Sequence, residues 1–286
     1  MAMPKPANVV YILEAFLPEP EMLEFRESSE HDGLGAGLGM PTLRIVEMSE
    51  RHGAVSYAEV KAMNPLKGAL ARESFLLLYA QLRRAALEHD ADALNDLGWL
   101  WLDGCTLNED PAIALHLFRL AAADDLSEAF FNLGQLYTYG IGVAVDEQMA
   151  QRWLKKAFKG GIREAALEVA WLYDARDQKG SCEASWVEAD NRKAFRWYRK
   201  AARAGDTAAF ARLGKSYLEG NGVSRHVSKG LFWLQRAALS GDAAAADALE
   251  YFYEDALYMP DPQGRMRLFW ASYAEGLRDA FECREC

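Results

Sequence analysis

A repeat with a period of about 36 residues restricts this chain to a fold of stacked copies of one small unit. Successive copies align at offsets of 36, 36, 44 and 36 residues, so five copies are present and the third holds eight extra residues. Four columns of this alignment are nearly uniform in residue type. They are Ala85, Ala121, Ala157, Ala201 and Ala237; Ala93, Ala129, Ala165, Ala209 and Ala245; Leu97, Leu133, Val169, Leu213 and Leu249; and Trp101, Tyr137, Tyr173, Tyr217 and Tyr253.

Within each copy the apolar residues recur at intervals of three and four, which predicts two helices per copy. In the second copy Ala129, Leu133 and Tyr137 mark one helix, and Trp153 and Ala157 mark the next. Small side chains let two helices approach closely, and large ones fill the grooves beside them. The alternation of alanine columns with large apolar columns therefore predicts an all-α protein of closely packed helix pairs.

Glycines stand between the two helices of a copy. Gly140 and Gly142 follow the first helix of the second copy, and Gly220 and Gly222 follow that of the fourth. Glycine adopts the left-handed backbone conformation that ends a helix without steric cost. We therefore expect these glycines to turn the chain rather than to bind a phosphate.

The units resemble Sel1-like repeats, which are relatives of the tetratricopeptide repeat with a slightly longer period. The second copy, AFFNLGQLYTYGIGVAVDEQMAQRWLKKAF, follows the family's run of alanine, Leu-Gly, tyrosine, Gly-x-Gly-Val, aspartate, alanine, tryptophan and alanine. The fourth, AAFARLGKSYLEGNGVSRHVSKGLFWLQRAA, follows it nearly as well. The resemblance covers about residues 72 to 255 and implies a right-handed α/α superhelical solenoid of about five repeats.

Three copies depart locally from the family pattern. Thr106 stands where the second loop glycine belongs in the first copy. The third copy has Ala170 in place of a glycine, and its insertion lies around QKGSCEASWVEAD. The fifth copy lacks the loop after Tyr253. Because the insertion is expected to protrude from one edge of the array, Trp186 at its centre is a second candidate for partner binding.

Three segments are expected along the chain. Residues 1–65 differ from the repeats and are predicted to form an N-terminal cap or small added module, with a candidate strand in VVYILEAF and a capping box from Ser56 to Glu59. Residues 66–258 form the repeat array. Because such arrays need polar caps, residues 259–286 are predicted to form a capping helix and tail. Its apolar residues at helical spacing are Met266, Phe269, Trp270 and Tyr273.

The charge balance limits the choice of partner. Forty-two acidic against 32 basic residues give a formal net charge of −10. That charge repels phosphate backbones and anionic lipid headgroups, so we expect neither nucleic acid nor a membrane as partner. The same argument favours a basic partner. No apolar run approaches the roughly 20 residues that span a bilayer, no signal-peptide pattern occurs, and the four cysteines are scattered, which together favour a cytoplasmic protein.

The motifs that would carry chemistry are incomplete. The glycines between positions 33 and 39 lie at every second residue and miss the G-x-G-x-x-G spacing, so a flexible loop is favoured. Cys283 and Cys286 would supply half of a tetrahedral zinc site, but no second pair is present, and incidental thiols on a frayed tail are favoured. The five histidines lack metal-ligand spacing. We therefore expect no catalytic residue, no bound metal and no cofactor.

Cysteine-rich Sel1-like proteins, with a regular cysteine pair in each repeat, have been associated with β-lactam binding or hydrolysis. This chain lacks those pairs, and it shows no nucleophile beside a base. The resemblance therefore does not support a hydrolase. An acidic stretch from Glu14 to Asp32 has two interpretations, a solvated surface, which is favoured, and a docking patch for a basic partner.

The surface expected to bind a partner follows from helix geometry. Residues two before and two after the column leucine lie about half a turn from the packing face of the first helix, so they are predicted to line the concave groove. In chain order these residues are Asn95 and Trp99, Phe131 and Gln135, Leu167 and Trp171, Ala211 and Lys215, and Asp247 and Tyr251. Exposed aromatics on such a face are typical anchors for a protein partner. Packing of Trp99, Trp171 or Tyr251 beneath the N-terminal module or the closing helix is an equally open alternative.

Two functional hypotheses follow from these patterns. The first is a non-catalytic scaffold or adaptor that holds a protein or peptide in its groove. A sharper form of it is a bacterial immunity protein or chaperone that neutralises a secreted toxin. The second is an enzyme or zinc-dependent switch that uses Cys283 and Cys286 or the N-terminal module.

Overall fold

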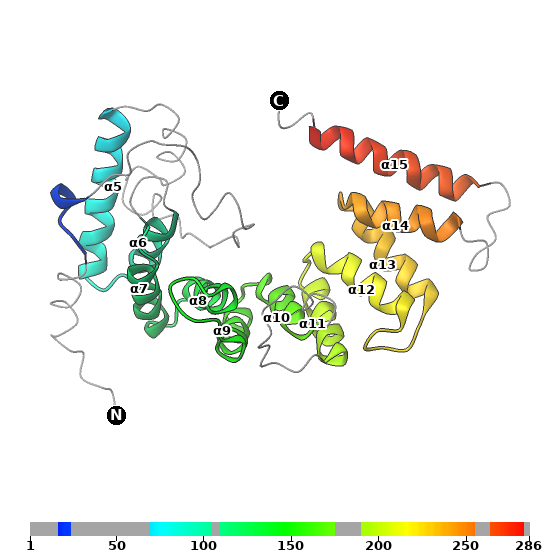
Figure 1. The fold of residues 1–286 in the computed structure, drawn as a ribbon, viewed down its shortest axis with the longest axis horizontal. Helices are drawn as coiled ribbons and strands as arrows, with labels where there is room; N and C mark the ends of the chain where they lie inside the picture. The colour runs from blue at the N-terminus through cyan, green and yellow to red at the C-terminus, as the bar shows by residue number, and fades with distance from the viewer. Residues whose placement is uncertain (1–16, 24–68, 104–108, 175–189, 255–263, 283–286) are drawn as a thin grey trace. The chain divides into compact units, whose positions relative to one another are not determined.

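The protein is described by a computed structural model that covers residues 17–23, 69–103, 109–174, 190–254 and 264–282 (Figure 1). Every element in these ranges is a helix, which confirms the all-α prediction for the described residues. In chain order the elements are η1 (Pro20–Met22), α5 (Ala69–Leu87), α6 (Ala91–Asp103), α7 (Pro111–Ala123), α8 (Ser127–Tyr139), α9 (Glu147–Lys159), α10 (Ala165–Tyr173), α11 (Asn191–Arg203), α12 (Ala208–Glu219), α13 (Val227–Leu239), α14 (Ala243–Glu254) and α15 (Arg265–Glu282).

The helices pack in consecutive pairs within two compact units. The first unit, residues 1–162, contains α5 and the pairs α6–α7 and α8–α9. The second unit, residues 163–286, contains the pairs α10–α11, α12–α13 and α14–α15. Each copy thus supplies the two helices that the spacing predicts. No helix in the described ranges is long and apolar enough to cross a membrane.

The uniform columns of the repeat form the core. Every residue of the second alanine column and of the leucine column is at most 1% exposed. Four aromatic-column residues are buried, and Tyr217 is half-buried. Burial of these side chains against the partner helix is the main favourable term that holds each pair together.

Backbone carbonyls of the first alanine column accept hydrogen bonds at the ends of α5, α7, α9, α11 and α13. Each carbonyl accepts a hydrogen bond from the amide five residues later, as in Asp90 N to Ala85 O (3.0 Å) and Ile162 N to Ala157 O (3.0 Å). This six-to-one bond is the Schellman motif, which needs a left-handed residue just before the donor. Those residues are His89, Asp125, Gly161, Gly205 and Gly241, with φ of 65°, 61°, 104°, 90° and 97°.

A second recurring bond fixes the loop between the two helices. The carbonyl of the aromatic column accepts the amide of the residue that caps the next helix, as in Asp146 N to Tyr137 O (3.0 Å) and His226 N to Tyr217 O (2.8 Å). In the third pair the same bond joins Asp190 N to Tyr173 O at 3.1 Å, although the insertion separates these residues in sequence. Tyr173 and Asp190, on either side of the insertion, therefore form the same hydrogen bond that joins the ends of the other loops.

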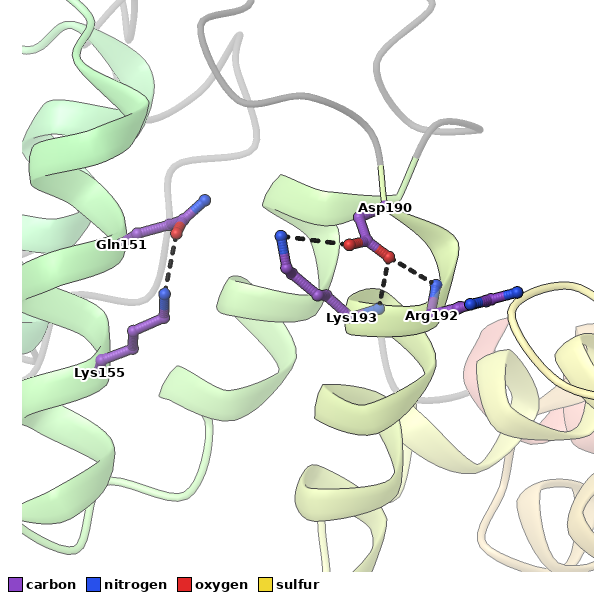
Figure 2. A network of polar contacts seen from close by, with 5 residues as sticks. All are labelled: Gln151, Lys155, Asp190, Arg192 and Lys193. Carbon is purple, nitrogen blue, oxygen red and sulfur yellow. Dashed lines mark hydrogen bonds and ion pairs between the residues drawn. The ribbon is translucent and has the colours of Figure 1, made fainter.

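The helix that follows this loop is capped by a side chain. In α11 the Asp190 carboxylate accepts hydrogen bonds from the amides of Arg192 and Lys193, both at 3.0 Å, and pairs with the Lys193 ammonium at 3.2 Å (Figure 2). The amide of Lys193, followed by its side chain, contributes most to holding the pKa of Asp190 below its usual range. Aspartate caps of this kind satisfy amides that the first turn leaves unpaired.

The described part of the N-terminal segment packs on α5. Leu17 and Leu23 are buried beside η1, the Tyr79 hydroxyl donates to the Pro18 carbonyl at 3.0 Å, and Arg83 forms an ion pair with Glu19 at 2.9 Å. The candidate strand, the glycine-rich run and the capping box of residues 1–65 lie outside the described residues.

The last helix, α15, packs on α14 as the second member of a fifth pair. Among the α15 side chains that the structure describes, Trp270 and Ala274 are buried, at 4% and 0% exposure. Arg278 Nη1 lies 3.0 Å from each carboxylate oxygen of Asp247, a residue of α14. The closing helix therefore continues the two-helix pattern of the repeats.

Candidate protein-interaction surfaces

Four of the residues predicted to line a groove are buried. Asn95, Phe131, Gln135 and Leu167 are 0%, 3%, 1% and 6% exposed. These side chains offer almost no surface to a partner, so the expectation of an accessible position is corrected at these four sites. The helical angle alone places a residue away from its own pair, but it does not say whether a neighbouring segment covers it.

A buried polar contact gives the physical reason for one of these cases. Asn132 on α8 donates from Nδ2 to Asn95 Oδ1 on α6 at 2.8 Å, and Asn95 donates in turn to the Asp96 carboxylate at 3.2 Å. Buried amides must find partners, because an unpaired polar group costs a large part of its hydration free energy. Asn95 is thus used to join the first helices of two successive pairs.

The other predicted positions remain accessible to different degrees. Trp99 and Trp171 are half-buried, Lys215 is exposed, and Tyr251 is 74% exposed. The Trp171 indole N–H is buried without a hydrogen-bond partner in the described part of the chain. Because Tyr251 is largely exposed, it does not pack beneath the closing helix. Ala211 and Asp247 are half-buried, and Asp247 is held by Arg278.

The second unit keeps three of these positions accessible at the same place on successive first helices. Trp171 lies on α10, Lys215 on α12 and Tyr251 on α14, each two residues after the buried column residue. Phe252 and Tyr253, which follow Tyr251, are each only 9% exposed, so the backbone beneath Tyr251 is anchored by packed neighbours. An exposed ring on a fixed helix buries a large area at small entropic cost when a partner covers it.

Other aromatic rings on the second helices are already in contact with cations. Trp153 stacks on Phe130 at 5.6 Å, and Lys156 lies over both rings at 4.6 and 5.0 Å. The same arrangement recurs in the fourth pair among Phe210, Trp233 and Arg236. These contacts join the two helices of one pair, which identifies these tryptophans as packing residues.

The pattern-based search for sites missed a basic helix surface. Arg192, Arg196, Arg199 and Arg203 on α11 are all exposed. Their spacing of four, three and four residues is visible in NRKAFRWYRKAAR, and it places them in one stripe along a helix. The net charge of −10 is a sum over the whole chain and does not show this local basic stripe.

No group of three or more metal-binding side chains occurs among the described residues. Cys283, Cys286, Trp186 and most of the acidic stretch lie outside that part of the chain, so the zinc hypothesis stays a prediction. Burial, followed by the charge of Arg119, lowers the pKa of His116, and burial raises the pKa of Asp206. Neither residue lies in the predicted groove set.

The fold and its recurring bonds define an all-α protein built from two-helix repeats. The sequence matches the Sel1 repeat over residues 91–126, 127–162, 164–206 and 208–242, which together make up just over half of the chain. The chain therefore belongs to the Sel1 repeat family, as its sequence resemblance indicated. The four matched repeats correspond to the pairs from α6–α7 to α12–α13. Proteins of this family generally mediate protein–protein interactions and are typically non-catalytic scaffolds.

Two solved structures share this fold at 24% sequence identity each. One is a protective antigen of uropathogenic Escherichia coli with an SLR fold, at a TM-score of 0.63 over 77% of this chain and 46% of that chain. The other is a Sel1 repeat protein from Oxalobacter formigenes, at a TM-score of 0.59 over 77% of this chain and 84% of that chain. An uncharacterized protein of Neisseria meningitidis serogroup B is 26% identical over 50% of this chain. The chain spans 35% of that relative's length.

Proposed function

We propose that this chain is a non-catalytic scaffold that binds a protein or peptide through accessible positions on its first helices. The observation that carries the proposal is Tyr251, which is 74% exposed on a helix whose next two residues are buried. Trp171 and Lys215 occupy the equivalent positions on α10 and α12. The two aromatic rings offer a large contact area, the Tyr251 hydroxyl can form a hydrogen bond, and Lys215 adds a charged end. The general role of Sel1 repeat proteins supports the same assignment.

The finer form of the proposal is an immunity protein or chaperone that masks a secreted bacterial toxin. The net charge of −10 suits a basic partner, because opposite net charges accelerate association at long range. A cytoplasmic location belongs to the same proposal. Stoichiometric binding that abolishes the activity of a toxin encoded nearby would support this form. A chain that neither binds such a toxin nor protects cells from it would contradict this form.

The test begins with the partners that a tagged chain captures in its native cell. The dominant partner is then purified and titrated into wild-type chain and into the Tyr251→Ala variant by calorimetry. We expect Tyr251→Ala to weaken binding by about tenfold or more, because exposed aromatic anchors contribute roughly 1 to 3 kcal/mol on removal. Lys215→Ala should weaken binding less, since lysine is depleted at interface cores.

Phe232→Ala is the matched control, because Phe232 is a 55% exposed aromatic on α13, a second helix. Circular dichroism of each variant checks that the helices remain folded. If Phe232→Ala weakens binding and Tyr251→Ala does not, the binding surface lies on the second helices and the proposal fails.

A further inference from the structure

The exposed surface of α11 carries only positive charge. Arg192, Arg196, Arg199 and Arg203 form the stripe described above, and Lys193 and Lys200 lie beside it, all exposed. The helix Asn191–Arg203 contains no acidic residue. Its opposite surface is apolar and buried, through Ala194, Phe195, Tyr198, Ala201 and Ala202. We call the four arginines the arginine stripe.

The charges of the arginine stripe are not neutralised within the described part of the chain. Asp190, at the start of α11, pairs with Lys193, and the guanidinium of Arg192 points away from that carboxylate (Figure 2). The Arg199 guanidinium lies over the Phe195 ring, with Cζ 6.0 Å from the ring centroid. No ion pair to any stripe arginine occurs among the described residues, and all four side chains are exposed.

The fold does not require this charge pattern. In α13 the equivalent four positions of the repeat are Ser228, Phe232, Gln235 and Leu239, and the helix packs in the same way. Like charges three and four residues apart destabilise a helix. The stripe therefore has a cost to folding that the equivalent positions of α13 avoid, which favours a binding role for it.

We propose that the arginine stripe binds an acidic, carboxylate-rich segment of a partner protein. A guanidinium offers a planar fork of donors that matches a carboxylate with two parallel hydrogen bonds, which a lysine ammonium cannot do. The stripe extends over about 17 Å, from the rise of roughly 1.5 Å per residue, so a helix of three turns with acids at the same spacing would fit. The net charge of −10 opposes a long phosphate backbone on this chain.

This inference rests on the proposed protein-binding function and adds a second surface to it. The arginine stripe lies on a second helix, whereas Trp171, Lys215 and Tyr251 lie on first helices. An acidic segment can bind the stripe even when the partner as a whole is basic, because the charges that meet are local ones. Variants of the stripe and of Tyr251 therefore test the two proposals separately.

The test uses the full chain and a labelled helical peptide with glutamates at positions 1, 5, 8 and 12, a spacing of three to four residues that forms one stripe. Fluorescence anisotropy measures its affinity at low and at moderate salt. We expect binding that weakens with salt, because screening shortens the range of exposed charges to about 10 Å at 0.1 M. The double variant Arg196→Glu with Arg199→Glu should lose about tenfold or more in affinity. Replacement of both by lysine should lose a smaller factor, since it removes the fork and keeps the charge.

Arg84→Glu with Arg265→Glu is the matched control, because it makes the same change in net charge at exposed residues of α5 and α15. It should alter affinity less than twofold, and circular dichroism should show unchanged helix content in all variants. Equal losses in the control and the stripe variants would contradict a localised site. Absence of peptide binding, or equal or tighter binding of a DNA oligonucleotide of the same charge, would overturn the assignment to an acidic protein segment. If Tyr251→Ala weakens binding of the partner and the stripe variants bind the peptide as tightly as wild type, the first proposal stands and the second is refuted.

Discussion

Single backbone positions decide how each repeat ends. Three of the five Schellman positions hold glycine, and the other two hold His89 and Asp125 in the same left-handed conformation. A side chain at such a position crowds the following carbonyl, and aspartate tolerates this better than most residues. The positions recur at the repeat offsets, and glycine at three of them is the signal of a left-handed turn. The left-handed backbone of His89 was not predicted, because histidine does not by itself indicate that conformation.

Replacing Asp125 by glycine should stabilise the protein. The change removes the steric cost of a left-handed aspartate, but glycine loses more backbone entropy on folding. The net effect is expected to raise the free energy of unfolding by about 0.5 kcal/mol. Urea denaturation followed by circular dichroism measures the shift. Gly161→Ala is the reverse control. Its new Cβ would have no atom within 4 Å, and φ is +104°, so the change affects stability through the strain of the left-handed backbone rather than through packing. It should cost about 1 kcal/mol. A stabilised Gly161→Ala would refute the backbone explanation.

Helix pairs are the units in which the packing is decided. The glycine that follows the column leucine allows close approach: a Cβ on Gly134 would lie 2.6 Å from Leu154 Cγ, and one on Gly214 would lie 2.9 Å from Leu234 Cγ. In the third pair this place is taken by Ala170, which is fully buried. The spacing of small residues predicted close helix contact, and the structure identifies the side chain that each glycine faces, which is Phe118 for the equivalent Gly98.

Gly134→Ala should therefore destabilise α8 and α9, although alanine is the better helix former. We expect a loss of about 1 to 3 kcal/mol, typical of forcing extra volume into a packed core. Gly276→Ala in α15 is the control, because its Cβ would have nothing within 4 Å. That change should raise stability by about 0.8 kcal/mol through helix propensity alone. Thermal denaturation of both variants gives the comparison, and a shift of the same sign in both would rule out the packing explanation.

At the scale of the whole molecule, the array continues beyond the four matched repeats. The α14–α15 pair follows them, and α5 with η1 precedes them. In repeat arrays each unit is stabilised mainly by the units beside it, so stability depends on how the terminal pairs are covered. The ion pairs between α14 and α15, Asp247 with Arg278 and Glu254 with Arg267, are exposed, so apolar burial is the main contribution.

Removing residues 259–286 should destabilise the C-terminal part of the array, because it uncovers the face of α14 that α15 covers. We expect a lower thermal midpoint and increased binding of a hydrophobic dye, measured on the truncated chain against the full chain. The full-length double variant Arg267→Ala with Arg278→Ala is the control and should lose at most about 1 kcal/mol. A truncated chain that melts at the midpoint of the full chain would show that α15 does not cap the array.

The sequence by itself determined the repeat period, the two helices of each copy, the core columns and the family. It could do so because the same residue types pack the two helices of each pair, so the same apolar columns recur in five copies. The tertiary structure decided which positions outside those columns are accessible. Asn95 and Gln135 are buried while Tyr251 is exposed at the same face, because accessibility depends on the segment that covers each helix rather than on its helical angle. It likewise decided that the arginines of α11 stand exposed without carboxylate partners among the described residues.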